Sequence, residues 1–373
     1  MQRQLITGAK RVVLKIGSSL VASRNLGLRH DFIAQLSRAI AELKSQQREI
    51  VMVSSGAIVA GIEKLGLKTY PQSIPLKQAA AAAGQSYLIH AYEKCFQDMG
   101  QKVAQVLLTH QDLSDRKRFL NARHTLTTLI ELGVIPIINE NDTVSVEEIR
   151  FGDNDTLAGQ VAHLVDADLF VILSDVNGLY TEDPRQNPQA ELLSVVEEIT
   201  PQIEHAAGKS RGQESRGGMI TKIQAAKHVG QFGVSTLIMN GEPAQCLAQA
   251  FAGENQGTLF LPQGRRLPSR KHWIAFTLRT KGQLILDDGA VEALRHRGKS
   301  LLASGILDIR GVFSSGDSVS CLDTNGKEFA KGLVNVSSDS LARIKGLKTK
   351  DVQQILGGKE YEEVIHRDNL ALL

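Results

Sequence analysis

The chain has 373 residues, of which 42% are hydrophobic and 22% charged, and its formal net charge is +3 at pH 7. This composition argues against a mostly disordered chain and against a surface built wholly for nucleic acid. The three cysteines, Cys95, Cys246 and Cys321, are too scattered for a disulfide framework or a zinc knuckle, which favours a reducing compartment. Neither a signal-peptide core nor a run of about eighteen apolar residues is present, so we expect a cytoplasmic protein without a membrane segment.

Short apolar runs alternate with longer helical patterns from Arg11 to about Leu261. The runs nearly lack polar residues, which is typical of strands covered on both faces. Between the first two, residues 31–46 place several large apolar side chains on one helical face. The alternation predicts an α/β fold with a mostly parallel sheet covered by helices on both faces, whose ligands bind beyond the carboxyl ends of the strands. The predicted strands are residues 11–16, 49–54, 102–108, 134–139, 168–174 and 234–239.

The pattern changes after Pro262, where a basic stretch with several prolines and no periodicity predicts a linker over residues 262–273. Beyond it come short strand-like pieces with frequent glycine. Two of them flank Asn325 and Gly326, and Asn-Gly is the strongest short signal for a β-hairpin. At this length two domains are a better expectation than one. We therefore expect one domain over residues 1–261 and a small β-rich domain with a C-terminal tail over residues 274–373.

Small polar residues follow the first two predicted strands. Lys15 lies at the end of a buried strand, where an ammonium group needs a partner or a ligand. Gly17 and Ser18 come next, and the second strand leads into Ser55 and Gly56. Such residues let backbone N–H groups approach an anion at a helix start, although glycine and serine are also common in ordinary turns. The buried lysine favours an anion site after the first strand.

Polar clusters also follow the fourth and fifth predicted strands. One cluster immediately precedes a helical run, and its three polar side chains exceed the single residue that a helix cap needs. Capping and a functional role are therefore both open for Asp153 and Asp155 at this point. The residues of these clusters are Asn139, Asp142, Asp153, Asn154, Asp155, Ser174 and Asp175.

A glycine-rich turn with a lysine leads into a later predicted helix, and this combination suits a phosphate group. Its residues are Arg216, Gly217, Gly218, Met219, Ile220, Thr221 and Lys222. The sequence from Gly298 to Ser300 only superficially resembles a Walker A loop, because Ala293 stands where that motif needs a glycine. No GxGxxG follows the first strand, so a dinucleotide site has no support.

The chain contains six notable motifs, in the order LKIGSSL, VSSGAIVAG, INENDTVS, FGDNDTLAG, LSDVNGLYTEDPR and RGGMITKIQAA. Together they resemble the amino acid kinase family, and within it the branch that phosphorylates glutamate. The resemblance covers nearly the whole chain, because the residues from about Ile274 to Gly357 are similar to the PUA domain that bacterial members of this branch often carry. Some of the motifs are shared with kinases of acetylglutamate, aspartate and carbamate.

The resemblance implies transfer of the γ-phosphoryl group of ATP to the side-chain carboxylate of glutamate. A carboxyl group with a pKa of about 4.3 is ionised near neutrality, so the nucleophile needs no general base. The obstacle is the approach of one anion to another. By this resemblance Lys15 and Lys222 contact the transferred phosphoryl group, and Asp155 holds both ammonium groups in position. Magnesium is expected on the ATP phosphates and water, with no protein ligand assigned.

The resemblance also implies the binding positions. For glutamate they are Ser55, Asp142 and Asn154, supported by Gly56, Asn139 and Asp153. For the nucleotide they are Lys15, Gly17, Ser18, Ser174, Asp175 and the seven residues from Arg216 to Lys222. Arg216 stands where the family usually has a small residue, which leaves the nucleotide contacts of that loop open.

Two alternatives stay open at this point. A sister enzyme would act on acetylglutamate, aspartate or carbamate instead of glutamate. An RNA-binding role would use the PUA domain and the basic residues Arg265, Arg266, Arg270 and Lys271, although such a run is more often a solvated linker. The resemblance further implies feedback inhibition by proline, a homo-oligomer (dimer or tetramer) and association with a glutamyl phosphate reductase.

Overall fold

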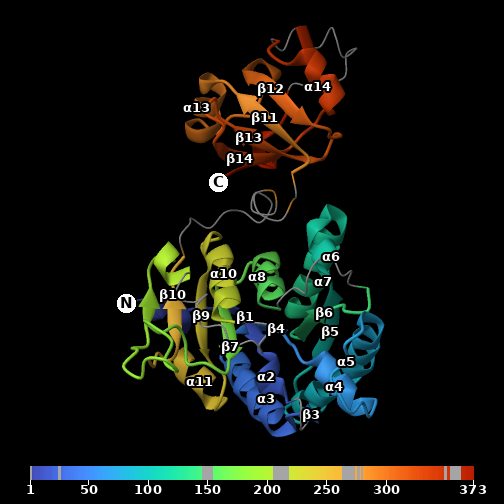
Figure 1. Ribbon diagram of the computed structural model, residues 1–373, viewed down its shortest axis with the longest axis vertical. Helices are drawn as coiled ribbons and strands as arrows, with labels where there is room; N and C mark the ends of the chain where they lie inside the picture. The colour runs from blue at the N-terminus through green and yellow to red at the C-terminus, as the bar shows by residue number, and fades with distance from the viewer. Residues whose placement is uncertain are drawn as a thin grey trace. The chain divides into compact units, whose positions relative to one another are not determined.

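The computed structural model describes residues 2–23, 27–144, 154–204, 218–262, 274, 278, 280–347, 351–352 and 363–373 (Figure 1). The chain divides into two compact units, residues 1–266 and 267–373. Each unit has its own sheet and its own hydrophobic core.

The first unit contains an eight-stranded sheet in the order β5-β6-β4-β1-β7-β9-β10-β8. The six strands from β5 to β9 in this order are parallel, which confirms the predicted sheet, and each predicted strand lies within one residue of an observed one. Its strands are β1 (Arg11–Ile16), β4 (Glu49–Val53), β5 (Val103–Leu108), β6 (Ile135–Glu140), β7 (Leu169–Ser174), β8 (Val195–Val196), β9 (Ser235–Asn240) and β10 (Thr258–Phe260).

Two short strands at one edge were not predicted. β10 pairs antiparallel with β9, and β8 pairs parallel with β10. Runs of two or three residues carry too little periodicity to be recognised as strands, so only tertiary pairing defines them. A further two-stranded ribbon joins β2 (Ala22–Ser23) and β3 (Gly27–Leu28) after the first strand.

Helices pack on both faces of this sheet. On one face α3 contacts α5 and α11, and its buried residues include the five predicted from the sequence: Phe32, Ile33, Leu36, Ile40 and Leu43. On the other face α8 and α10 lie side by side, and α7 contacts β6 and β4 (Figure 1). The helices are α1 (Gln4–Thr7), α2 (Ser18–Val21), α3 (His30–Ser45), α4 (Ala57–Lys64), α5 (Ile74–Gln97), α6 (His110–Ser114), α7 (Arg116–Glu131), α8 (Asn154–Leu164), α10 (Met219–Gly230) and α11 (Gln245–Phe251).

Helices α4 and α5 approach unusually closely at two glycines. A Cβ added at Gly61 would lie 1.7 Å from the carbonyl oxygen of Ala80, and one added at Gly84 would lie 1.8 Å from that of Ala57. Ala80 itself is buried in α5. Because Ala57 is the first residue of α4, this contact sets the position of the turn that precedes the helix.

The second unit is built on a five-stranded sheet in the order β12-β11-β13-β14-β15. Strands β13 (Ser318–Leu322) and β14 (Glu328–Leu333) pair antiparallel around Asn325 and Gly326, which confirms the predicted hairpin. Gly326 has a φ of +78°, a conformation that glycine adopts without strain. The other elements described in this unit are β11 (Gly282–Leu286), α13 (Asp288–His296), the 3-10 helix η2 (Ala303–Gly305), β12 (Ile306–Gly311), α14 (Ser338–Ile344), the 3-10 helix η3 (Arg367–Asn369) and β15 (Leu370–Leu372).

Candidate active site

The carboxyl ends of β1, β4, β6 and β7 lie along one edge of the sheet, because these strands are parallel neighbours. Lys15 is near the end of β1, and its backbone pairs with Val53 and Ile172. Leu14 and Ile16 belong to the core on the α3 face. Since successive side chains in a strand alternate, Lys15 projects to the opposite face, where α8 and α10 cover the sheet.

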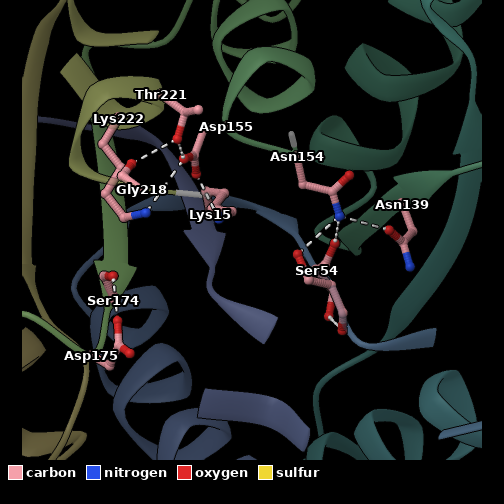
Figure 2. Close-up of polar contacts among 11 residues, drawn as sticks. Lys15, Ser54, Asn139, Asn154, Asp155, Ser174, Asp175, Gly218, Thr221 and Lys222 are labelled. Atoms are coloured by element: carbon pink, nitrogen blue, oxygen red, sulfur yellow. Dashed lines mark hydrogen bonds and ion pairs between the residues drawn. The ribbon is translucent and has the colours of Figure 1, made fainter. Parts of the chain in front are cut away.

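A buried cluster joins Lys15, Asp155 and Lys222, which come from β1, α8 and α10 (Figure 2). The Nζ atom of Lys15 lies 2.5 Å from Oδ1 of Asp155, and Nζ of Lys222 lies 3.5 Å from Oδ2. Asp155 is fully buried, and each lysine is 5% exposed. The structure therefore places one carboxylate between two ammonium groups, the arrangement expected from the family resemblance.

Two ammonium groups and one carboxylate of the described residues meet in this cluster. Burying ions is costly unless they are paired or hydrogen-bonded, and all three groups are nearly closed to water. Two ammonium groups so close together attract an anion, so the cluster is suited to contact a phosphoryl group.

Thr221 completes the first cluster. Its Oγ1 lies 3.1 Å from Oδ2 of Asp155 and 2.8 Å from the carbonyl oxygen of Gly218, the cap residue of α10. Thr221 and Lys222 are consecutive residues in the first turn of that helix. The beginning of α10 is thus attached to Asp155 through two side chains.

A second polar cluster surrounds Asn154, the first residue of α8 (Figure 2). Its Nδ2 donates to the carbonyl oxygen of Ser54 at 2.7 Å, to Oγ of Ser55 at 2.9 Å and to Oδ1 of Asn139 at 3.1 Å. Ser54 and Ser55 follow β4 and Asn139 lies near the end of β6, so the start of α8 is joined to two other segments. Side chains at this position can contact a small polar molecule through hydroxyl and amide groups.

Behind this cluster a tyrosine of α5 contacts Ser54. The hydroxyl groups of Tyr92 and Ser54 lie 3.3 Å apart, and Tyr92 is fully buried. Burial raises the pKa of Tyr92 to about 12, so its hydroxyl stays neutral. The sequence analysis missed Tyr92, because nothing in the pattern of α5 indicates which of its buried residues reaches the end of β4.

Asp142 lies two residues beyond β6 and is half-buried. Burial, together with the nearby Glu140 carboxylate, raises the pKa of Asp142 to about 7. A cationic group bound beside it would stabilise its charged form. This carboxyl group is therefore suited to bind an ammonium ion of a ligand.

Glycines shape the loops at the strand ends. Gly56, which precedes α4, has a φ of +95°, a left-handed conformation that favours glycine. A Cβ at Gly17 would lie 3.1 Å from the carbonyl oxygen of Leu173, so β1 and β7 are close where Ser18 begins α2. On the β7 side, the hydroxyl of Ser174 donates to Oδ1 of Asp175 at 3.1 Å, below the lysine pair in Figure 2.

Most of the predicted site residues thus lie in loops or helix starts at one edge of the sheet. Gly218 caps α10, and Met219 and Ile220 are its first two residues, both half-buried. The structure does not describe Asp153, Arg216 or Gly217, nor the basic residues Arg265, Arg266, Arg270 and Lys271, so their predicted roles lie outside the described residues.

The described residues provide no set of protein ligands for a metal ion. Within them no group of three or more His, Cys, Asp or Glu side chains could hold one. Asp155 is committed to the lysines. The donor set of the described residues does not fit a metal bound by protein ligands alone.

Comparison with known proteins identifies the family. The model of the amino acid kinase family matches residues 10–240, which include both polar clusters. The chain belongs to the amino acid kinase family. A PUA domain model matches residues 282–356 in the second unit. The predicted fold class, an amino acid kinase fold followed by a β-rich PUA domain, is therefore confirmed.

Relatives of this amino acid kinase span its full length. It is 50% identical over 373 residues to the glutamate 5-kinase of Geobacter sulfurreducens and 51% identical to that of Geobacter metallireducens, with 100% of each chain covered. Its fold is similar to that of Giardia lamblia carbamate kinase bound to AMP-PNP, with 15% identity and a TM-score of 0.50, covering 69% of this chain and 100% of the other.

Two further findings concern membrane-spanning helices and the cysteines of this kinase. No helix in the described parts of the chain has the length and hydropathy to cross a membrane. All three cysteines are free thiols.

Proposed function

We propose that this kinase transfers the γ-phosphoryl group of ATP to the side-chain carboxylate of L-glutamate, giving glutamyl 5-phosphate in the first step of proline biosynthesis. The observation that carries the proposal is the buried arrangement of Lys15, Asp155 and Lys222 at the edge of the sheet. The names of the full-length relatives supply the substrate.

In the proposed reaction a carboxylate oxygen of glutamate forms a bond to the γ-phosphorus, the bond to the β,γ-bridging oxygen breaks, and ADP leaves with that electron pair. The carboxylate needs no general base, because it is ionised near neutral pH. The loose transition state spreads negative charge over the transferred oxygens. Lys15 and Lys222 provide positive charge on that group, and Asp155 keeps the two ammonium groups from separating.

Glutamate is proposed to bind around Asn154, with its carboxylates near the donors of Ser55, Asn154 and Gly56. Asn154 holds its place through Asn139 and the Ser54 carbonyl. The carboxyl group of Asp142 then meets the α-ammonium group, and Asp153 supports the pocket. An acetylated amino group carries no positive charge, so this arrangement disfavours acetylglutamate.

ATP is proposed to bind on the other side of the lysine pair. Gly17 and Ser18 offer backbone N–H groups to the phosphates, and the loops at Ser174–Asp175 and 216–222 hold the remainder of the nucleotide. Magnesium would arrive on the ATP phosphates and neutralise part of their charge. The protein residues described above bind and orient both substrates.

A panel of acceptors tests this proposal. The purified protein should form ADP with ATP and glutamate, and hydroxylamine should trap the acyl phosphate as a hydroxamate. Aspartate, acetylglutamate and carbamate should give little activity under the same conditions. Activity on aspartate without activity on glutamate would replace the proposed substrate by a sister compound.

Several expectations extend this proposal to the cellular location, the domain bounds and the binding partners of the protein. We infer cytoplasmic location, which the free thiols support. We also propose that residues 1–261 form the catalytic domain and 274–373 the PUA domain with its tail. Proline as feedback inhibitor, a homo-oligomer, association with the reductase and RNA binding stay predictions. A salt-dependent RNA affinity lost on neutralising the basic residues at 265, 266, 270 and 271 would support the last.

A further inference from the structure

A buried phenol lies behind the loop that follows β4. Tyr92 of α5 is fully buried, and its hydroxyl lies 3.3 Å from that of Ser54, which is also fully buried. The Ser54 hydroxyl in turn lies 3.3 Å from the backbone carbonyl oxygen of Ser55. Because a buried phenol is costly without a hydrogen-bond partner, the contact with Tyr92 holds the Ser54 side chain in place.

The direction of these hydrogen bonds follows from the number of protons, since each hydroxyl has one proton to donate. If Tyr92 donates to Ser54 and Ser54 donates to the Ser55 carbonyl oxygen, both protons have an acceptor. In the opposite direction the phenol proton would have no acceptor among the residues that the structure describes. The hydrogen bonds therefore run from Tyr92 through Ser54 to the backbone.

The Ser55 carbonyl belongs to the peptide unit that continues into Gly56. This peptide is planar and trans, so its carbonyl and its N–H point to opposite sides. A hydrogen bond that fixes the Ser55 carbonyl thus also fixes the direction of the Gly56 N–H. The preceding peptide is held as well, because the Ser54 carbonyl oxygen accepts a hydrogen bond from Nδ2 of Asn154 at 2.7 Å.

A small cavity adjoins Ser54, and Gln85 and Asn139 are among the other residues that line it. The Ser54 side chain therefore has space into which it can turn. The contact with the Tyr92 hydroxyl opposes that rotation. Without the phenol hydroxyl, Ser54 can turn toward the cavity and release the Ser55 carbonyl.

We propose that Tyr92 is a positioning residue for the phosphoryl acceptor, because its hydroxyl, acting through Ser54, fixes the peptide unit that presents the Gly56 N–H to a carboxylate of glutamate. This inference rests on the proposed function for its kinetic consequences. Tyr92 contacts neither substrate in this role. A donor that is held in one orientation before the acceptor arrives does not have to be ordered during binding, which lowers the cost of binding.

Tyr92→Phe tests the proposal, because phenylalanine keeps the ring and removes only the hydroxyl. Loss of one hydrogen bond should raise the KM for glutamate about three- to tenfold. The KM for ATP should change less than about twofold, because the nucleotide is proposed to bind on the other side of the lysine pair. An unchanged KM for glutamate, or equal increases in both KM values, would overturn the proposal.

Tyr87 provides the matched control, since it lies in the same helix and the same group can be removed from it. Its hydroxyl contacts the exposed residues Glu63 and His30 instead of the end of β4. Tyr87→Phe should leave both KM values within about twofold of those of the unmodified protein. A rise in the KM for glutamate as large as that in Tyr92→Phe would contradict the specific role of the buried phenol.

Ser54→Ala shows whether Tyr92 acts through Ser54. Alone, this substitution leaves the phenol buried without its acceptor, so the denaturant concentration at the midpoint of unfolding should fall. Adding Tyr92→Phe should raise that midpoint again and should add little to the KM for glutamate, because both substitutions remove the same hydrogen bond. If the losses from the two substitutions simply add, Tyr92 acts independently of Ser54 and the proposal is wrong.

A crystal structure of Tyr92→Phe tests the inference even if glutamate is not the substrate. The Ser54 hydroxyl should turn toward the cavity, and its distance to the Ser55 carbonyl oxygen should exceed the 3.3 Å of the unmodified protein. Unchanged positions of Ser54 and of the peptide that follows Ser55 would overturn the inference. Absence of glutamate turnover in the unmodified protein would overturn only the proposed function.

Discussion

At the residue scale, one carboxylate serves two ammonium groups that lie far apart in the sequence. Asp155 is fully buried and pairs with Lys15 and Lys222. Removing either lysine leaves the carboxylate with one cationic partner, so such a variant should still fold. Removing the carboxylate leaves two buried ammonium groups without their counterion, which is the more damaging change.

Lys15→Ala and Lys222→Ala should each lower kcat by roughly two to three orders of magnitude, the usual effect of deleting one donor to a developing negative charge. A coupled assay that detects ADP measures kcat for each variant. Lys227 lies on the same helix as Lys222 but on its exposed side, paired with Glu204. Lys227→Ala should therefore keep full turnover. If either active-site variant kept it too, the proposed electrostatic mechanism would be wrong.

The carboxyl group of Asp142 should make glutamate binding depend on pH. Its pKa is raised to about 7 by burial and by Glu140, so it is largely neutral at pH 6 and charged at pH 8. Since the charged form binds an ammonium group, the KM for glutamate should fall as pH rises through about 7. Steady-state kinetics between pH 6 and 8 would show this. The free energy of unfolding should change in the opposite direction. Because the pKa of Asp142 is raised in the folded protein, this group stabilises the folded state at low pH, and that contribution is lost as pH rises through about 7.

Asp142→Asn provides the comparison for that pH dependence. The amide has no charge to gain, so the variant should show a high KM for glutamate that hardly changes over the same range. In the unmodified protein, glutamate binding near pH 6.5 should release protons, which calorimetry in buffers of different ionisation enthalpy detects. The same pH dependence in both proteins would exclude Asp142 as its source.

At the element scale, the start of α8 supplies both halves of the site. Consecutive helical residues point about 100° apart, because the helix has 3.6 residues per turn. Asn154 therefore reaches the loop after β4, while Asp155 reaches β1 and α10 (Figure 2). The first two residues of α8 thus fix the position of the Asn154 cluster relative to the lysine pair.

The close contact between α4 and α5 should be sensitive to a single methyl group. A Cβ at Gly84 would lie 1.8 Å from the Ala57 carbonyl oxygen, and neither backbone can yield without moving α4. Gly84→Ala should therefore destabilise the first unit by about 1–3 kcal/mol or more, the cost of overpacking, and raise the KM for glutamate by displacing Ser55 and Gly56. Denaturant unfolding measures the loss of stability, and steady-state kinetics measure the KM for glutamate.

Gly289 provides a matched substitution in another helix. It is exposed in α13, and an added Cβ would lie 3.4 Å from the nearest atom, an ordinary contact. Gly289→Ala should stabilise its unit by up to about 1 kcal/mol through helix propensity. A Gly84→Ala variant as stable as the unmodified protein would contradict the packing described for α4 and α5.

At the scale of the whole molecule, the described site residues all belong to the first unit, and the two units have separate cores. The backbone N–H of Leu261 still donates to the carbonyl oxygen of Val196, which closes the edge of the sheet. A chain ending at residue 261 should therefore fold and keep kcat within a few-fold of the full-length protein. Circular dichroism and the ADP assay test this. Loss of turnover in a folded chain of this length would give the second unit a direct part in catalysis.

Local patterns were sufficient for much of the fold. The six parallel strands, the apolar face of α3 and the hairpin at Asn325 depend on periodicity and turn chemistry, which neighbouring residues alone determine. The lysine at the end of β1 also indicated that a partner or a ligand lies beside it, because an unpaired ammonium group is too costly inside a protein.

Other features have no local signal. The bonds from Asn154 to Ser54 and from Thr221 to Asp155 join residues 100 and 66 positions apart. Their partners depend on which loops the strand order brings together. The pairing of β10 and the approach of Gly84 to Ala57 depend in the same way on distant segments.

The sequence by itself determined the alternation of strands and helices and the kinds of polar group that follow each strand. Only the tertiary structure decided which ammonium group lies close to Asp155, that Thr221 shares its oxygen, and that Tyr92 contacts Ser54. The physical reason is range: propensity and periodicity act over a few residues, whereas ion pairs and hydrogen bonds depend on distances that packing of the whole unit establishes.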